Sequence, residues 1–581
     1  MSTNISGKKR EALLSKIEQI KNFIEVNADE KNASQLLGYL GELSREVNGK
    51  KYGLVFEEHR EKIDELLEEN APVFTEEKKL FVDNGGELNF LLEGDNLASL
   101  KLLEKTHRGK IDVIYIDPPY NTGNKDFIYD DDFVDSTDQF RHSKWLSFME
   151  KRLQIARSLL SEKAFIFISI DDNEQSNLKC ICDEIFGEEN FVANIPTIMN
   201  LKGNQDEYGF AGTHEYTVVY AKNKIKGNLG LFRIDEHDEE FVRWEVDEMG
   251  FYKKGANLKS TGVNAPREKR PNLFFPIYVC EDGTFSVDEK LKNSTEVYPI
   301  TDGKEMSWRW SKDKFKNEKH NVIISQEDGK IAIYKKQRPE LGDLPSKKPK
   351  SFFYKPEYSS GNGTSQIKDI FGDKLFNNPK PIDLIKDFLQ LSTFNSPFST
   401  VLDFFAGSGT TGHAVLKLNA EDGGHRKFIL CTNNENNICR DITYQRLKTA
   451  ITGKRKDKSK YSDGLPGSLK YFKTAFISIS EKMYYEYADE LLLHVRELVE
   501  LENAVNFDKD ASVAIVLDDD EMEVFVKRIV GSSPTMTVDS PIKTLYLGHD
   551  VLLSSKQERI LKAHNISVNV IPDYYYRELA L

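Results

Sequence analysis

The sequence has few cysteines and no long apolar segment. Five cysteines occur in 581 residues, with Cys180 and Cys182 two positions apart and no second close pair. This usage predicts neither a disulfide framework nor a zinc site, and we expect no bound metal. No run approaches the roughly 18 apolar residues of a membrane-spanning helix. The first ten residues lack the apolar core of a signal peptide, so we expect a cytoplasmic protein with no membrane partner.

The chain also has no excess of positive charge. The chain carries 80 Lys and Arg against 94 Asp and Glu, a net charge of −14. This balance disfavours a uniformly basic nucleic-acid-binding domain, but local clusters decide more than the total. Residues 454–460 are basic, and residues 347–355 interleave lysines with aromatic side chains. Charge runs usually form solvated faces, whereas lysines mixed with aromatics are also typical of nucleic-acid contacts.

Strands and helices alternate over most of the chain. Apolar runs at 89–92, 111–116, 164–170, 400–403 and 427–432 are predicted strands, and helical periodicity follows most of them. This alternation predicts an α/β fold with a doubly wound, mostly parallel sheet. We expect a helical N-terminal arm (1–75), two halves of one sheet (76–223 and 376–480), an inserted module without βα alternation (224–375), and a small α/β C-terminal module (481–581) with a hairpin formed by 512–517 and 523–526.

Residues 117–120 (Asp-Pro-Pro-Tyr) directly follow the β-branched run at 111–116. Prolines lack an N–H and have a fixed φ, so the pair ends the strand in a stiff turn. Ligands of open α/β sheets bind at the carboxyl ends of strands, where this turn lies. Asp117 and the Pro118 carbonyl can accept the two hydrogens of a planar amine, and Tyr120 can stack on its ring. An ordinary turn with an exposed Asp and Tyr is the alternative interpretation.

A second signature spans residues 400–412. A strand ending in Asp403 is followed by glycines in the pattern G-x-G-x-x-G and then by a helix. Glycines allow a ligand to approach the backbone, and the helix N-terminus offers free N–H groups. The glycine pattern alone suggests a dinucleotide. Because Asp403 would repel a pyrophosphate and bind the ammonium of an amino acid, we predict S-adenosylmethionine rather than NAD.

The order of the two signatures is informative. The Asp-Pro-Pro-Tyr turn precedes the glycine-rich turn, with the inserted module between them. This order resembles the β-class amino-methyltransferases of DNA, which share a D/N/S-P-P-Y/F/W motif. From about residue 30 to 475 the chain resembles the modification (Mod) subunits of type III restriction–modification systems. The resemblance rests on the motifs at 93–97, 117–123, 141–146, 168–174, 214–216, 270–273, 403–411 and 433–436.

The resemblance implies a Rossmann-like methyltransferase sheet in the permuted, β-class order. Asp117, Pro118, Pro119 and Tyr120 would form the catalytic turn. The turn after Asp403 would hold the methionine and ribose parts of the cofactor. Many relatives have an acid for the ribose where this chain has Thr432, so that contact is open. The predicted cofactor-binding residues are Asp95, Asn96, Asp117, Asn121, Trp145, Asp403, Phe404, Phe405, Ala406, Gly407, Gly409, Thr410, Thr411 and Glu435, with Asp95 on the adenine amine.

The chemistry of the amine supports the same assignment. The exocyclic amine of adenine is a weak nucleophile because its lone pair is conjugated with the ring. Hydrogen bonds to Asp117 and Pro118 would localise that lone pair and stabilise the charge that develops during methyl transfer. The base must leave the duplex to be reached. We therefore predict a site-specific DNA adenine-N6 methyltransferase, with a cytosine-N4 enzyme and a catalytically silent DNA-specificity subunit as alternatives.

The resemblance also implies partners. The predicted partners are double-stranded DNA, a second copy of the chain in a homodimer, and a restriction (Res) subunit. The module at 224–375 is the predicted target-recognition domain, because it interrupts the sheet and mixes basic with aromatic residues.

Overall fold

The computed structural model describes residues 56–123, 127–129, 132–203, 209–234, 238–327, 329–339, 345–393, 396, 398–479, 491–531, 542–572 and 575, together with 13–21 and a few single positions before 56. The chain divides into two compact units. The first unit comprises Met1–Asn228, Phe352–Lys386 and Phe398–Leu581, and the second comprises Leu229–Ser351 and Asp387–Pro397. Leu229–Ser351 falls within the segment predicted to be an inserted module (224–375), whereas Asp387–Pro397 lies in the segment predicted to be the second half of the sheet (376–480).

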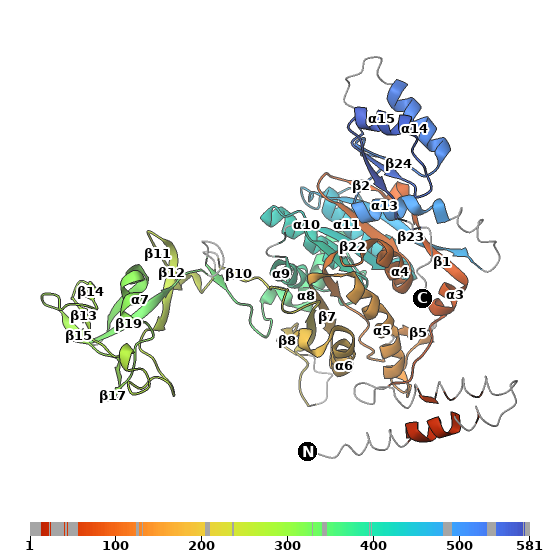
Figure 1. Cartoon of the computed structure of the whole chain (residues 1–581). Helices are drawn as coiled ribbons and strands as arrows, with labels where there is room; N and C mark the ends of the chain where they lie inside the picture. Colours follow the sequence, from red (N-terminus) through yellow and green to blue (C-terminus); the bar gives the residue numbers. More distant parts are fainter. Residues whose placement is uncertain are drawn as a thin grey trace. The chain divides into compact units, whose positions relative to one another are not determined.

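One ten-stranded sheet organises the first unit (Figure 1). Its six central strands are parallel to their neighbours, and antiparallel strands flank them on both sides. The predicted α/β fold is therefore confirmed, with a mixed sheet. The strands in sheet order are β1 (Asn70–Glu76), β23 (Ser468–Ser478), β3 (Leu88–Glu93), β22 (Lys427–Thr432), β21 (Thr400–Asp403), β4 (Ile111–Ile116), β7 (Leu160–Ile170), β9 (His214–Ala221) and β8 (Phe191–Ile198), with β2 (Val82–Asp83) beside β23.

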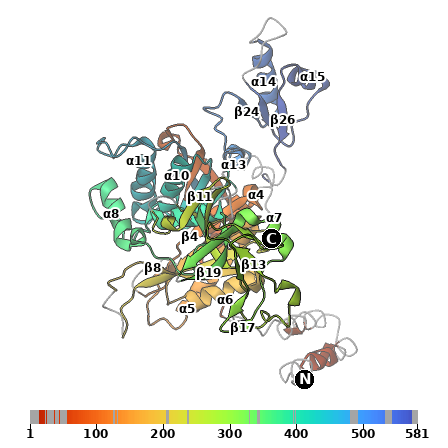
Figure 2. The same cartoon turned by 90° about the vertical axis from the view of Figure 1, so that its left-hand side faces the viewer.

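Helices cover both faces of this sheet. Figures 1 and 2 show α4, α5 and α6 on one face and α10 and α11 on the other. The helices predicted to follow most of the strands are confirmed, for example after β3, β7 and β21. The helices of the first unit are α3 (Lys62–Glu69), α4 (Asn96–His107), α5 (Arg141–Leu159), α6 (Gln175–Phe186), α8 (Ser360–Phe371), α10 (Thr410–Asp422), α11 (Tyr444–Thr452) and α13 (Val495–Asn503), and α9 (Ile382–Ser392) spans the junction of the two units.

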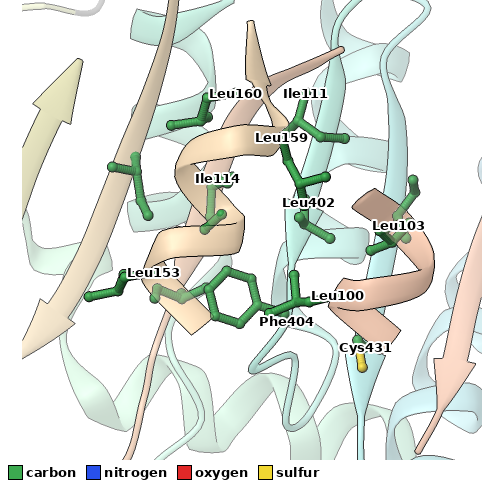
Figure 3. Packing of buried hydrophobic residues seen from close by; sticks show 14 of the residues in the cluster. Leu100, Leu103, Ile111, Ile114, Leu153, Leu159, Leu160, Leu402, Phe404 and Cys431 are labelled. Atoms are coloured by element: carbon green, nitrogen blue, oxygen red, sulfur yellow. The ribbon is translucent and has the colours of Figure 1, made fainter. Parts of the chain in front are cut away.

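The main core lies between the sheet and the α4–α5–α6 layer. β4 and β21 are mostly buried on both faces, as expected for parallel strands that helices cover on both sides. Fully burying one leucine contributes about 1.5–3 kcal/mol, so this cluster supplies much of the stability that fixes the strand ends. Figure 3 shows the packing of Leu100, Leu103, Ile111, Ile114, Leu153, Leu159, Leu160, Leu402, Phe404 and Cys431.

The second unit is built from small antiparallel sheets around its own core. Trp308 is buried there, and its Nε1 donates a hydrogen bond to the carbonyl of Phe275 at 2.8 Å. Phe315 packs edge-on against the ring of Trp308. The main elements are a four-stranded sheet, in the order β11 (Trp244–Asp247), β12 (Gly250–Asn257), β19 (Lys330–Gln337) and β18 (Val322–Glu327), a three-stranded sheet of β14 (Phe285–Ser286), β13 (Ile277–Val279) and β15 (Thr295–Val297), the paired strands β10 (Phe232–Arg233) and β20 (Ser346–Lys347), the pair β16 (Ile300–Thr301) and β17 (Lys304–Glu305), and α7 (Lys312–Asn317).

The C-terminal segment contains a small parallel sheet rather than the predicted hairpin. β24 (Val513–Val516), β25 (Thr544–Leu547) and β26 (Ser567–Val570) pair in parallel, with α14 (Asp519–Gly531) and α15 (Ser555–Ala563) as connections. The prediction of a strand at 523–526 is wrong, because these residues lie in α14. Met522, Phe525 and Ile529 are buried at helical spacing, and this longer repeat decides the conformation.

Much of the predicted N-terminal arm lies outside the described residues. Residues 13–21 are helical, and α3 confirms helix at 62–69. Within the described part of the chain, no helix is long and apolar enough to cross a membrane.

Candidate active site

The two predicted signatures meet at the centre of the main sheet. β4 and β21 are neighbouring parallel strands, with Val401 opposite Val113 and Leu402 opposite Ile114. The chain leaves β4 towards β7 and leaves β21 towards β22, in opposite directions along the sheet. Such a switch point opens a crevice at the carboxyl ends of the strands, where ligands of α/β sheets bind. Asp117 and Asp403 both lie at this edge.

A buried tryptophan supports the Asp-Pro-Pro-Tyr turn. Trp145 of α5 is fully buried, and its Nε1 donates a hydrogen bond to the carbonyl of Pro119 at 2.7 Å. Among the described residues, no donor bonds to the carbonyl of Pro118. Trp145, which we predicted to line the cofactor, thus supports the turn and presents no surface to a ligand. The free carbonyl is the one predicted to accept an amine hydrogen.

Four polar side chains lie close together at this turn. Lys380 Nζ lies 2.9 Å from Asp117 Oδ1 and 3.3 Å from Glu215 Oε2, and it donates a hydrogen bond to the Tyr120 hydroxyl at 2.7 Å. The Tyr120 hydroxyl in turn lies 2.9 Å from Asp117 Oδ1 and 3.2 Å from Glu215 Oε2. We call Asp117, Tyr120, Glu215 and Lys380 the catalytic cluster. The Lys380 ammonium is thus largely buried and forms ion pairs with two carboxylates.

Burial and neighbouring charges shift the pKa values of Lys380 and Glu215. Burial alone would lower the pKa of Lys380, but the Asp117 and Glu215 carboxylates raise the pKa above its usual value. Burial raises the pKa of Glu215, and the neighbouring Asp117 adds to that rise while Lys380 opposes it. The Oε1 atom of Glu215 is buried and has no hydrogen-bond partner among the described residues. Lys380 is therefore a firmly charged group, and Glu215 is its weaker counterion.

Lys380 and Glu215 were not among the site residues predicted from the sequence. Lys380 lies between two prolines, just before α9. Glu215 lies in the His214–Tyr216 motif, which was noted as a resemblance without an assigned role. A short Pro-Lys-Pro sequence was the available signal for Lys380. Nothing in the local pattern shows that it reaches Asp117.

The glycine-rich turn encloses a buried carboxylate. Asp403 is almost fully buried, and it accepts hydrogen bonds from the Phe405 N–H at 3.0 Å and from the Thr411 hydroxyl at 2.5 Å. Burial raises the pKa of Asp403 to about 7. Within the described residues, no basic side chain lies within ion-pair distance of Asp403. A cationic ligand would therefore supply the partner that the chain itself does not provide.

Left-handed backbone at Gly407 and Gly409 shapes this turn. Their φ values are 47° and 76°, which disfavour residues with a Cβ. A Cβ at Gly409 would also lie 3.0 Å from Cγ2 of Thr443, whose hydroxyl bonds to the Gly407 carbonyl at 2.5 Å. Arg446 supports the turn from the buried side, donating to the Thr410 hydroxyl at 2.7 Å and the Ser408 hydroxyl at 3.0 Å. The turn is thus held in a fixed shape before α10.

Asp95 and Asn96 connect β3 to the same edge. Asp95 caps α4 through Oδ1, which accepts hydrogen bonds from the N–H groups of Leu97 and Ala98. Asn96 Nδ2 donates to the Phe404 carbonyl at 3.0 Å, and Arg152 Nε donates to Asn96 Oδ1 at 2.6 Å. The partly exposed Asp95 carboxylate keeps Oδ2 for a ligand, apart from the Arg152 guanidinium at 3.8 Å. Asp95 is therefore both a helix cap and a candidate contact.

Other predicted cofactor residues have internal partners. Asn121, in a left-handed conformation and fully buried, donates to Glu174 Oε1 at 2.5 Å. Phe404 belongs to the buried core, whereas Phe405 is half-buried. Glu435 is exposed just after β22, where left-handed Asn436 and Asn437 follow. Thus Asn121, Trp145, Phe404, Thr410 and Thr411 build the site from within, whereas Asp95, Asn96, Asp117, Phe405 and Glu435 keep exposed surface.

Comparisons with known proteins agree with this geometry. The model of the DNA methylase family N6_N4_Mtase matches residues 111–445. The chain is 46% identical over 382 residues to the type III restriction–modification enzyme EcoPI Mod subunit of Escherichia phage P1, covering 61% of this chain and 58% of that protein. It is 36% identical over 346 residues to the type II methyltransferase M.KpnI of Klebsiella pneumoniae, covering 59% and 79%.

A further relative is the type III restriction–modification enzyme StyLTI Mod subunit of Salmonella typhimurium, 34% identical over 383 residues, covering 61% of this chain and 54% of that protein. The match thus spans little more than half the length of the two Mod subunits. The family model covers more than half of this chain and includes both the Asp-Pro-Pro-Tyr turn and the glycine-rich turn. This chain belongs to the N6_N4_Mtase family of DNA methylases.

Proposed function

We propose that the chain is a site-specific DNA methyltransferase that transfers a methyl group from S-adenosylmethionine to the N6 amine of a flipped adenine. The observation that carries this proposal is the adjacency of Asp117 and Asp403 at the carboxyl ends of two neighbouring strands. One acid suits an amine acceptor, and the other suits the ammonium of an amino-acid cofactor. The order of the two signatures in the chain supports the permuted, β-class arrangement.

The residues around Asp403 fit S-adenosylmethionine. A buried carboxylate without a basic partner matches the cofactor's ammonium, and the glycine-rich turn has no side chain that would block its approach. Asp95 Oδ2 would accept from the adenine amine of the cofactor, and Glu435, three residues after Thr432 in the sequence, would contact the ribose. When bound, S-adenosylmethionine supplies an electrophilic methyl group on a sulfonium that needs no further activation. The chain's own task is therefore to position the acceptor amine.

The catalytic cluster is arranged for that positioning. Lys380 and Tyr120 both contact Oδ1 of Asp117, which leaves Oδ2 to accept one hydrogen of the adenine amine. The free Pro118 carbonyl would accept the other. Two fixed acceptors hold the nitrogen lone pair towards the methyl group and stabilise the positive charge that develops on nitrogen. We assign stacking on the flipped base to Tyr120, as the turn predicts.

We further propose that the second unit reads the DNA sequence. Residues 229–351 carry 23 Lys and Arg against 22 Asp and Glu, whereas the rest of the chain carries 57 against 72. On the four-stranded sheet, Lys254 Nζ lies 4.2 Å from the Tyr334 ring centre and Lys336 Nζ lies 4.1 Å from that of Tyr252. Basic and aromatic side chains of this kind contact phosphates and bases. Exchanging residues 229–351 for those of a relative should change the methylated sequence; an unchanged site would place recognition elsewhere.

The resemblance to Mod subunits extends the proposal to an assembly. We propose a homodimer in which one copy mainly reads DNA and the other mainly methylates, together with a restriction (Res) subunit, in a cytoplasmic type III system. Light scattering at micromolar concentration should give a dimer. A stable, active monomer would contradict this part of the proposal.

One experiment tests the reaction itself. DNA from a host that expresses the chain is digested to nucleosides and analysed by mass spectrometry, and single-molecule mapping then locates the modified sites. N6-methyladenine at one sequence is the expected product. N4-methylcytosine would show that the acceptor is cytosine, and no methylated product would show that the chain is catalytically silent.

A further inference from the structure

We propose that four exposed apolar side chains beside the catalytic cluster contact the duplex from which the target base is extruded, and that Leu201 and Phe210 act as a wedge in the base stack. This inference rests on the proposed function. The four are Leu201, Phe210, Phe352 and Tyr354, which we call the edge patch. Their side chains are 66%, 88%, 49% and 47% exposed. Single exposed apolar residues are ordinary, but several on adjoining segments indicate an interaction surface.

Backbone hydrogen bonds hold the three segments of the edge patch together. The Ile198 N–H donates to the Phe353 carbonyl, and the Phe353 N–H donates to the Pro196 carbonyl, both at 2.9 Å. The Met199 N–H donates to the Thr213 carbonyl at 3.0 Å, at the base of the β8–β9 connection. The residues around 198, 212 and 353 thus form one continuous edge of the main sheet.

This edge adjoins the catalytic cluster. Thr197 of β8 pairs with Glu215 of β9 on one side and bridges to Phe353 on the other. Neighbouring strands lie about 4.8 Å apart, so Phe353 lies roughly 10 Å from Glu215. The β8–β9 connection begins two residues beyond Thr197 and Glu215, at the same end of the sheet as Asp117. The edge patch is therefore beside the place where a flipped base would enter.

The backbone directs these side chains outwards. Phe353 is buried and stacks on Tyr358, with ring centres 6.0 Å apart, so its neighbours Phe352 and Tyr354 face the other way. Leu201 and Phe210 lie on opposite arms of the β8–β9 connection.

These two arms pack closely near their ends. A Cβ on Gly203 would lie only 2.4 Å from Cβ of Ala211, so this contact requires glycine, whose φ is 72°. Gly203 and Ala211 thus bring the two arms that carry Leu201 and Phe210 into contact.

Duplex DNA is the occupant that fits this position. Extruding a base leaves a gap in the stack and costs a few kcal/mol of unstacking. Proteins that distort DNA offset this cost by inserting Phe, Leu or similar side chains between base steps. Lys202 follows Leu201 and Lys355 follows Tyr354, so positive charge suited to phosphates borders the apolar side chains. A surface for another protein would have no reason to adjoin the base-binding cluster.

The test compares two DNA substrates that carry the sequence the wild-type protein methylates. One has the target adenine paired with thymine, and the other has it opposite an abasic site, where extrusion is easier. The double variant Leu201→Ala/Phe210→Ala should methylate the paired duplex at least tenfold more slowly and the abasic duplex at nearly the wild-type rate. With 2-aminopurine at the target, the variant should give a smaller fluorescence rise on the paired duplex. Binding of S-adenosylmethionine, measured by calorimetry, should be unchanged and reports correct folding.

Ile225→Ala is the matched control. Ile225 is 96% exposed in the first unit, beyond the other end of β9, and its loss should change neither rate. Equal rates for the double variant and wild type, or an equal loss on both substrates, would overturn the wedge. An equal loss together with a changed mass in light scattering would assign the edge patch to a protein contact instead. Absence of N6-methyladenine from the DNA of the expressing host, which defines the substrate sequence, would refute the proposed function itself.

Discussion

Replacing Lys380 by methionine tests whether one buried ammonium organises the catalytic cluster. Methionine keeps the length and apolar body of the side chain and removes the charge. Asp117 and Glu215 would then share the Tyr120 hydroxyl, at 2.9 and 3.2 Å, without their counterion. Removing one member of a buried ion pair costs about 3–5 kcal/mol, and we expect about 3 kcal/mol because Asp117 remains partly exposed.

The stability lost in Lys380→Met should depend on pH. Glu215 already has a raised pKa, and loss of the Lys380 charge would raise that pKa further in the folded variant. The folded variant would then bind more protons than the unfolded chain, so its stability falls as pH rises. In the wild type, the raised pKa of Lys380 gives stability that is lost only at alkaline pH. The difference in unfolding free energy between the two proteins should therefore narrow as pH falls, by at most about 1.4 kcal/mol per pH unit for one titrating group.

The Lys380→Met substitution should lower turnover as well as stability. With Oδ1 of Asp117 no longer held, the amine loses a fixed acceptor, and we expect turnover to drop about a hundredfold, as when one pre-placed group is removed. Denaturant unfolding at pH 6 and 8, calorimetry with S-adenosylmethionine and single-turnover methylation measure the three quantities. Lys386→Met, which removes the lysine paired with Glu421 at 2.9 Å, is the control and should cost below about 1 kcal/mol. A Lys380→Met protein with wild-type turnover and stability would show that the cluster does not position Asp117.

Two further substitutions separate the steps of the reaction. Asp117→Ala should bind S-adenosylmethionine and DNA nearly as well as wild type while turnover falls by about two orders of magnitude or more, and near-full turnover would make Asp117 only a turn former. Asp403→Asn should weaken cofactor binding strongly, and calorimetry showing unchanged affinity would refute the assignment. Because the pKa of Asp403 is raised to about 7 and the ammonium requires the ionised form, wild-type affinity should fall about tenfold from pH 8 to pH 6, and Asp403→Asn should lose this dependence.

The sequence by itself located the strands that carry the site. An apolar run followed by a proline pair at 117–120, and a strand followed by glycines at 403–412, are local signals because chain stereochemistry fixes where each strand stops. The placement of Asp117 and Asp403 at one sheet edge followed from βα alternation, and the adjacent parallel strands β4 and β21 confirm it. The strand expected at 523–526 failed because a four-residue pattern is too short to compete with the helical repeat of Met522, Phe525 and Ile529.

Only the tertiary structure brought Lys380 and Glu215 to Asp117. Lys380 is 260 residues from Tyr120 and Glu215 is 95, and their contacts depend on how β9 and the start of α9 pack against the sheet. Burial, which shifts the pKa values of Lys380, Glu215 and Asp403, is likewise a property of the packed core. Local sequence patterns determine where a helix or strand begins and ends. Proximity and desolvation between distant residues arise only once the sheet has assembled, and they decide which charges act together.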